Sequence, residues 1–288
     1  MHFSRIPVAA FLALGAASAS AQLSSGAGAE FTTGKFGTTE TTNQLYIPFT
    51  AKLETGRWTW KATVPYLVVS GPANVIGGGE DRIPVSNSGS GSSGSGSGGS
   101  GSGGSGSGGS GSSGGGGSPS SDDDGQRTAS GLGDIVTSVS YALFDQPSTG
   151  IGLDIGGRVK FGTADVPERL GTGENDWSVQ ADLYKAFGGL TMFATLGYRW
   201  YGDPPGIELR DVPYWALGAS YRLAGGSTIG AAYDHRSPIA PAGAAISEAT
   251  VYWSKRFSRE WRVQLYAIVG FSDGSPDAGA GSFLEYRF

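Results

Sequence analysis

The sequence of 288 residues contains no cysteine, only two histidines and no long apolar run. Without cysteine, neither a disulfide framework nor a thiolate metal site can form. No apolar stretch reaches the roughly 18 residues that a transmembrane helix requires. The net charge of −5 arises from 20 basic and 25 acidic residues, without the concentrated basic surface that nucleic-acid binding requires. We therefore predict no cofactor, no metal site and no nucleic-acid partner.

The first 21 residues have the features of a secretory signal peptide. Arg5 supplies the positive charge that precedes an apolar core at 6–17, and Ala19-Ser20-Ala21 forms a small-x-small cleavage site before Gln22. A polar face, which an amphipathic helix would show, is missing from this segment. We predict that residues 1–21 are removed after export, with cleavage near Ala21, and that residues 22–288 form one domain.

Apolar and polar residues alternate along most of the remaining chain, in segments separated by turn signals. In the last segment, Leu284, Tyr286 and Phe288 fall on one side, and Glu285 and Arg287 fall on the other. Such alternation is typical of strands with one apolar and one polar face. The pattern predicts twelve strands, at 28–36, 43–54, 57–70, 132–144, 151–161, 175–187, 190–201, 212–223, 227–236, 246–257, 261–272 and 281–288.

Prolines fall inside two of these predicted strands. Pro48 lies in the second and Pro65 in the third, although proline cannot donate a hydrogen bond to a neighbouring strand. We expect a β-bulge at each of these positions.

Two features favour a membrane barrel over a soluble β-sandwich. Short turns and long loops alternate between the predicted strands, as they do between the periplasmic and external sides of outer-membrane barrels. Large aromatic residues also gather near the strand ends, as in the two aromatic girdles of such barrels; they are Trp58, Phe187, Tyr221, Trp261, Tyr286 and Phe288 at one end, and Tyr66, Phe161, Trp177, Trp200, Trp215 and Phe271 at the other. The predicted fold is all-β, a transmembrane antiparallel up-and-down β-barrel of about twelve strands.

A low-complexity segment at 87–129 interrupts the strand pattern. Residues 88–118 are all serine or glycine, and three aspartates follow at 122–124. Such a tract cannot bury enough apolar area to offset its ordering entropy, so we expect disorder. A domain linker is one interpretation, but three preceding strands are too few for a separate barrel. We therefore expect a long extracellular loop within one barrel, with the aspartates as a solvated acidic run rather than a cation site.

The polar faces of the predicted strands carry charged residues that would line the lumen. The candidates are Lys61, Asp134, Asp154, Arg158, Lys160, Asp182, Arg199, Arg222, Arg236, Glu248, Arg256, Arg262, Glu285 and Arg287. Their signs are mixed, so they predict no strong selectivity for anions or cations. Ion pairs that fill a narrow interior and a polar conduit for a small solute are both open interpretations.

One motif leaves an enzymatic alternative open. His235 and Ser237 have the His-x-Ser spacing of outer-membrane phospholipases and lipid A deacylases, and on a strand both side chains would face lipid. A histidine beside a serine is the pair that nucleophilic catalysis requires. Pro238 and Ile239 follow, however, in place of the Asn-Gly of those enzymes. We therefore predict no enzymatic activity and keep the lipid hydrolase as the weakest alternative.

Three segments between Ser130 and Phe288 resemble a known family. They are Ser130-Gly131-Leu132-Gly133-Asp134-Ile135 with Tyr141, Leu170-Gly171-Thr172-Gly173-Glu174-Asn175-Asp176, and Gly270-Phe271-Ser272-Asp273-Gly274-Ser275-Pro276-Asp277 with Tyr286-Arg287-Phe288. They are similar to motifs of the MetA-pathway outer-membrane transporters, named for phenol degradation. The resemblance implies an outer-membrane barrel with a transport role for small, hydrophobic or aromatic solutes, and it implies no catalytic residues.

The sequence thus predicts a porin-like channel in a bacterial outer membrane for the passive uptake of small solutes. The expected partners are the solute, the lipid and lipopolysaccharide of that membrane, and the outer-membrane assembly machinery, which would recognise the last strand ending in Phe288. A structural or adhesive barrel that displays the Ser/Gly loop is the main alternative function.

Overall fold

The computed structural model describes residues 21–72, 75–84, 127–146, 148–241 and 243–288. The predicted signal peptide up to residue 20 and the Ser/Gly tract both lie outside these residues. Within the described part of the chain, no helix combines the length and the apolar character needed to cross a bilayer.

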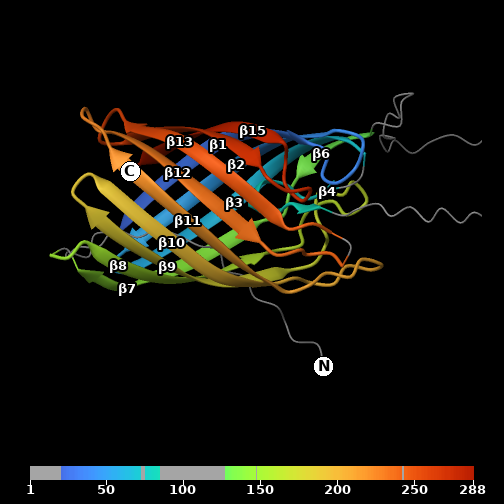
Figure 1. Cartoon of the computed structure of the whole chain (residues 1–288), viewed down its shortest axis with the longest axis horizontal. Coiled ribbons are helices and arrows are strands. Elements are labelled where there is room, and N and C mark those ends of the chain that lie inside the picture. The colour runs from blue at the N-terminus through green and yellow to red at the C-terminus, as the bar shows by residue number, and fades with distance from the viewer. Residues whose placement is uncertain (1–20, 73–74, 85–126, 147, 242) are drawn as a thin grey trace, which may run out of the picture.

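The chain forms a closed antiparallel up-and-down barrel of twelve strands, which confirms the predicted fold (Figure 1). Each strand pairs with its sequence neighbours, and β1 closes the ring against β15 in a register from Ser24–Arg287 to Thr33–Ala278. The wall consists of β1 (Gln22–Gly34), β2 (Thr42–Thr55), β3 (Trp58–Gly71), β6 (Arg127–Leu132) continued by β7 (Val136–Gln146), β8 (Ile151–Lys160), β9 (Asp176–Phe187), β10 (Leu190–Trp200), β11 (Val212–Arg222), β12 (Ser227–Arg236), β13 (Ile246–Arg256), β14 (Trp261–Gly270) and β15 (Ala278–Arg287).

Two expectations about the first strands need correction. The first strand begins at Gln22 rather than at residue 28, because the small residues that precede Gly28 hide the alternation but still pair with β2 and β15. Pro48 causes no bulge, since the register of β1 and β2 is the same on both sides of it. Pro65 does lie opposite a bulge, where 133–135 separate β6 from β7 and Gly133 N–H donates to Pro65 O at 2.8 Å.

The outward face of the barrel is apolar. Leu196 of β10, Leu217 of β11 and Val251 of β13 are examples of large aliphatic side chains that are more than half exposed. Aromatic rings pack against one another at the strand ends, including Trp261 with Tyr286 at a centroid distance of 4.8 Å near the turns and Tyr198 with Trp200 at 5.0 Å near the loops. Only hydrocarbon can cover a continuous apolar band of this kind, so the barrel spans a membrane.

The connections define two ends of the barrel. We call the end with the short connections, such as 188–189 and 223–226, the turn end, and the opposite end the loop end. The chain ends of the described barrel, Gln22 and Phe288, lie together at the turn end, where Phe288 N–H donates to Leu23 O at 3.0 Å.

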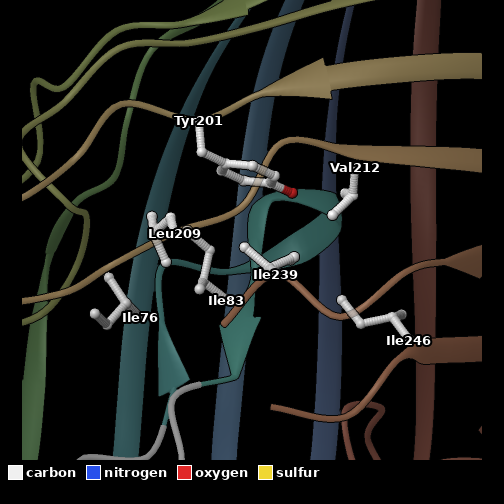
Figure 2. Packing of buried hydrophobic residues seen from close by; sticks show 7 residues of the cluster. All are labelled: Ile76, Ile83, Tyr201, Leu209, Val212, Ile239 and Ile246. Atoms are coloured by element: carbon white, nitrogen blue, oxygen red, sulfur yellow. The ribbon is translucent and has the colours of Figure 1, made fainter. Parts of the chain in front are cut away.

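Loops fold over the mouth at the loop end and pack into an apolar cluster. Figure 2 shows this cluster, in which side chains from three connections and the adjoining strand ends meet: Ile76, Ile83, Tyr201, Leu209, Val212, Ile239 and Ile246. A second cluster joins Leu67 of β3 and Ala129 of β6 to Ala164 and Leu170 of the loop between β8 and β9. The mouth at the loop end is therefore a packed structure, unlike the turn end.

Candidate functional site: a hairpin across the lumen

The segment after β3 turns back into the barrel as a short hairpin. Its arms are β4 (Val75–Ile76) and β5 (Ile83–Pro84), and its tip is η1, a 3-10 turn at Gly79–Asp81. We call residues 75–84 the lumen hairpin. The buried side chains of Ile76 and Ile83 anchor its arms in the apolar cluster of Figure 2. Sequence analysis did not predict this element.

Three consecutive glycines bring the hairpin close to the barrel wall. Gly77 and Gly79 have positive φ angles of 73° and 59°, which favour glycine. A Cβ atom at Gly78 would overlap the side chain of Leu67, and one at Gly79 would lie 2.9 Å from the ring of Tyr46. Both wall residues point into the barrel, so the glycines allow the hairpin backbone to lie directly on their side chains.

The tip of the hairpin connects opposite walls of the lumen through three consecutive charged residues. Glu80 Oε2 lies 2.8 Å from Arg158 Nη1 of β8, and Asp81 forms ion pairs with both Arg158 and Arg199 of β10. Arg82 points the other way: its guanidinium lies 3.2 Å from Glu30 of β1 and 3.1 Å from Glu248 of β13. Since β1 and β10 lie half a turn apart in the barrel, residues 80–82 cross the bore.

Further contacts secure the same crossing. Arg236 of β12 donates to the backbone oxygen of Glu80 at 2.8 Å, and Gln44 of β2 donates to Gly77 O at 3.1 Å. The Glu80 side chain is nevertheless 83% exposed, while that of Arg82 is only 7% exposed. Because Glu80 lies inside the barrel, its exposure shows open space in the lumen beside the hairpin.

Electrostatics keep the two acids of the tip ionised. The guanidinium of Arg158 holds the pKa of Glu80 below its usual range. Burial alone would raise the pKa of Asp81, but Arg158 and Arg199 outweigh it, so the pKa of Asp81 also lies below its usual range. The acids therefore carry full charge against the arginine wall at neutral pH.

A buried ion-pair cluster fixes the loop between β8 and β9 beside the hairpin. Lys160 Nζ lies 2.8 Å from Asp134 and 3.2 Å from Asp176, and it also donates to Thr172 Oγ1 at 3.0 Å. Asp134 in turn accepts from the backbone N–H groups of Thr163 and Ala164. Of the predicted lumen residues, Asp134 and Lys160 thus organise a loop rather than face open space.

Other predicted residues lie nearer the middle or the turn end. Asp182 accepts from Thr195 at 2.6 Å and from Gln180 at 2.7 Å, and Asp154 is fully buried. Three basic residues are more accessible: Lys61 is partly exposed, and Arg222 and Arg256 are exposed at strand ends. The ion pairs here are one within β2, between Lys52 and Glu54 at 3.2 Å, and two longer ones, Lys52 with Glu285 and Glu54 with Arg287, each at 3.8 Å. Arg262 donates a hydrogen bond to Ser254 at 2.9 Å.

Inward aromatic rings lie flat against the barrel wall, over glycines of the neighbouring strand. The ring of Tyr252 occupies the space that a Cβ of Gly230 would need. The same arrangement recurs for Tyr184 over Gly152, Tyr214 over Gly197, Tyr266 over Gly281 and Phe193 over Gly218. Aromatic side chains can therefore line the lumen without crossing it, with their ring faces toward the open bore.

The histidine considered for catalysis has a different partner from the one predicted. His235 Nδ1 lies 2.9 Å from Ser247 Oγ of β13, its direct cross-strand neighbour, and its ring packs on Trp215 at 5.5 Å. Ser237 lies beyond the end of β12, where its N–H contacts Pro213 O at 3.3 Å. Ser247 is itself held among the serines of the loop at 271–277, through Ser275. The structure therefore pairs His235 with Ser247 and not with Ser237.

A closed barrel with an apolar exterior, a polar and aromatic lumen and a loop folded across the bore has the fold of the outer-membrane β-barrels. The chain is similar to the COG4313 outer membrane channel from Pseudomonas putida F1, with a TM-score of 0.62 and 12% identity over 94% of this chain and 97% of that one. The KdgM porin gives a TM-score of 0.46 and 10% identity over 92% of this chain and 99% of that one. At these identities the likeness concerns the fold. No known family profile and no curated protein sequence matches the chain.

Proposed function

We propose that this protein is an outer-membrane channel for the passive uptake of small solutes, hydrophobic or aromatic ones among them. The observation that supports it most is the lumen itself. Polar and charged side chains and flat tyrosine rings line it, and the element that crosses it is held by ion pairs and leaves open space beside Glu80. A purely structural barrel has no need of open, polar space in its interior.

The aromatic preference rests on the resemblance to the MetA-pathway transporters and on the inward rings over glycine. Ring faces attract other rings in offset or tilted geometry, each pair contributing about 0.5–1.5 kcal/mol. Several such weak contacts along a path suit transport, because a solute must leave each contact as easily as it enters. The outer membrane, its lipopolysaccharide and the assembly machinery that would recognise β15 are the partners that this proposal implies.

Reconstituted protein tests the proposal. In planar bilayers we expect discrete conductance steps, and in proteoliposomes we expect faster uptake of phenyl glucoside than of methyl glucoside, two uncharged sugars that differ in their aromatic group. A barrel that passes neither ions nor solutes, in the native form and after deletion of residues 75–84, would refute a channel. Equal uptake of the two glucosides would refute the aromatic preference alone.

The adhesive alternative concerns residues outside the described part of the chain. It predicts that deletion of 88–118 abolishes surface binding and leaves permeability unchanged. The hydrolase alternative predicts that a Ser237→Ala variant loses a measurable phospholipid hydrolysis. In the structure, His235 is hydrogen-bonded to Ser247 and not to Ser237.

A further inference from the structure

Three arginines on alternate strands form a basic face on one side of the lumen. Arg158 of β8, Arg199 of β10 and Arg236 of β12 all reach the hairpin tip. Among the described residues, the carboxylates that form ion pairs with Arg158 and Arg199 are those of Glu80 and Asp81. The ion pairs of Arg158 and Arg199 therefore come from a loop, while Asp176 of the wall acts on Arg199 from beyond ion-pair distance.

The arginines around Asp81 have the geometry of a binding site for one carboxylate group. One carboxylate oxygen contacts Arg158 Nη2, and the other lies 3.1 Å from Arg199 Nη1, so guanidinium groups of two strands hold a single carboxylate. The contact with Arg199 is an ion pair without hydrogen-bond alignment, since Oδ1 has no hydrogen-bond partner among the described residues. Planar guanidinium groups match planar carboxylates in shape and in donor spacing.

The same face has binding capacity that the hairpin leaves unused. Arg158 Nε is buried without a hydrogen-bond partner in the described part of the chain. Glu80 meets Arg158 through one oxygen only, and its side chain is largely exposed to the lumen. A second carboxylate could therefore approach the arginines from the open space beside Glu80.

We propose that the face formed by Arg158, Arg199 and Arg236 is a carboxylate-binding subsite of the permeation path, which Glu80 and Asp81 occupy when the hairpin lies across the bore. A solute that carries a carboxylate competes with these side chains for the arginines and so favours displacement of the hairpin tip. Arg82, released on the other side, leaves Glu30 and Glu248 to repel the anion toward the basic face. This inference rests on the proposed channel function and adds the chemical class of solute.

The competition is feasible because one carboxylate, from the hairpin, is replaced by another carboxylate, from the solute. Both the internal and the incoming carboxylate are charged and hydrogen-bonded to the same guanidinium groups, so the net cost of exchange is small. A tethered group on a short segment acts at an effective concentration of about the millimolar range. Solutes should therefore compete at millimolar concentrations, which suits a passive path with weak binding.

Reversal potentials of single channels test the subsite. They are measured under a gradient of KCl and under a gradient of potassium acetate, for the native protein, Arg199→Gln, Asp81→Asn and Arg259→Gln. Arg259 is exposed in the turn after β13, so its variant removes the same charge far from the hairpin. The native sequence, Arg199→Gln and Arg259→Gln are also measured in a background without residues 75–84, where the arginines are free of the hairpin carboxylates. Because each channel reports its own selectivity, the yield of folded protein does not affect the result.

We expect Arg199→Gln to lower the acetate-to-potassium permeability ratio several-fold and to change the chloride ratio much less. Asp81→Asn should raise the acetate ratio, and Arg259→Gln should match the native protein. Acetate ratios that do not depend on Arg199 in either background would overturn the subsite. Parallel changes for acetate and chloride would also overturn it, because they indicate a general anion field. Absence of current in every variant would instead refute the channel function.

Discussion

The two halves of the lumen carry similar side chains but arrange them differently. At the loop end, a hairpin supplies counter-charges to both walls, with ion pairs of 2.8 Å to Arg158 and 3.1 Å to Glu248. At the turn end, the closest approach of Glu285 to Lys52 is 3.8 Å. Arg222 and Arg256 are exposed there. The wall alone therefore does not close the bore. The contacts of the lumen hairpin decide where the lumen is narrow.

The largest expected effect comes from neutralising the hairpin tip. The triple variant Glu80→Gln, Asp81→Asn, Arg82→Gln removes every ion pair between the tip and the two walls. We expect conductance in planar bilayers to rise several-fold, because only the arms and the hydrogen bonds from Arg236 and Gln44 to backbone oxygens then hold the hairpin.

A matched triple variant at the turn end tests the comparison directly. Glu54→Gln, Glu285→Gln, Arg287→Gln also removes two acids and one base, but its ion pairs lie within β2 at 3.2 Å or join β2 to β15 past β1 at 3.8 Å, so they do not cross the bore. Its conductance change should be much smaller. Equal changes in the two triples would show that the hairpin does not control the bore.

A smaller effect is expected from loosening the apolar anchor. Ile83 is 1% exposed in the cluster of Figure 2, and truncation of a buried isoleucine to alanine typically costs about 2–5 kcal/mol. The Ile83→Ala variant should weaken docking of the hairpin and increase the frequency of openings in single-channel records. Ile229→Ala, which removes the same atoms from the lipid-facing surface, serves as control. Similar opening frequencies in both variants would contradict the anchoring role.

Replacing a glycine that lies under a tyrosine ring should lower the conductance modestly, whereas the hairpin variants should raise conductance or opening frequency. In Gly230→Ala, the new Cβ displaces the ring of Tyr252 from the wall toward the lumen. We expect a lower unitary conductance with unchanged opening frequency, since the hairpin is not involved. The double variant Gly230→Ala, Tyr252→Ala should recover the native conductance. Failure to recover would show that the ring is not the obstacle.

The smallest effect is expected from pH in the neutral range. The pKa values of Glu80 and Asp81 are lowered, so their ion pairs are intact above the ordinary carboxyl pKa of about 4 and are lost as the pH falls through the still lower values in the folded protein. The arginines remain charged throughout. Opening frequency should stay constant from pH 8 to pH 5 and rise only below about pH 4. A change near pH 6 that persists in the Asp234→Asn variant would contradict this assignment, because Asp234 of β12 is a lumen carboxylate that acts on both Glu80 and Glu248.

The wall was predictable because its pattern is local and repeated. Each strand shows a period of two, and each lipid-facing residue is independent of distant partners. The start of β1 was missed because Ser24, Ser25 and Gly26 are small and show no contrast between faces. The bulge opposite Pro65 was placed correctly, whereas Pro48 is accommodated without a change of register.

The site was less predictable because it depends on contacts between distant segments. Arg158, Arg199, Arg236 and Glu248 were assigned to the lumen from their strand faces, but no element was predicted for the loop at 75–84 that meets them. The available signal was short: three glycines, then Glu-Asp-Arg, between two apolar pairs. That pattern is compatible with a buried hairpin, but the strands that its charges contact are known only once the barrel is closed around it.

The separation of wall and hairpin has a consequence for how such a protein can diversify. The bilayer-spanning strands tolerate few changes, because each must present apolar side chains to lipid and form hydrogen bonds with both neighbouring strands. The lumen hairpin, by contrast, consists of a few adjacent residues in one connection. New permeation properties can therefore evolve through changes in that short segment, while the barrel around it stays the same.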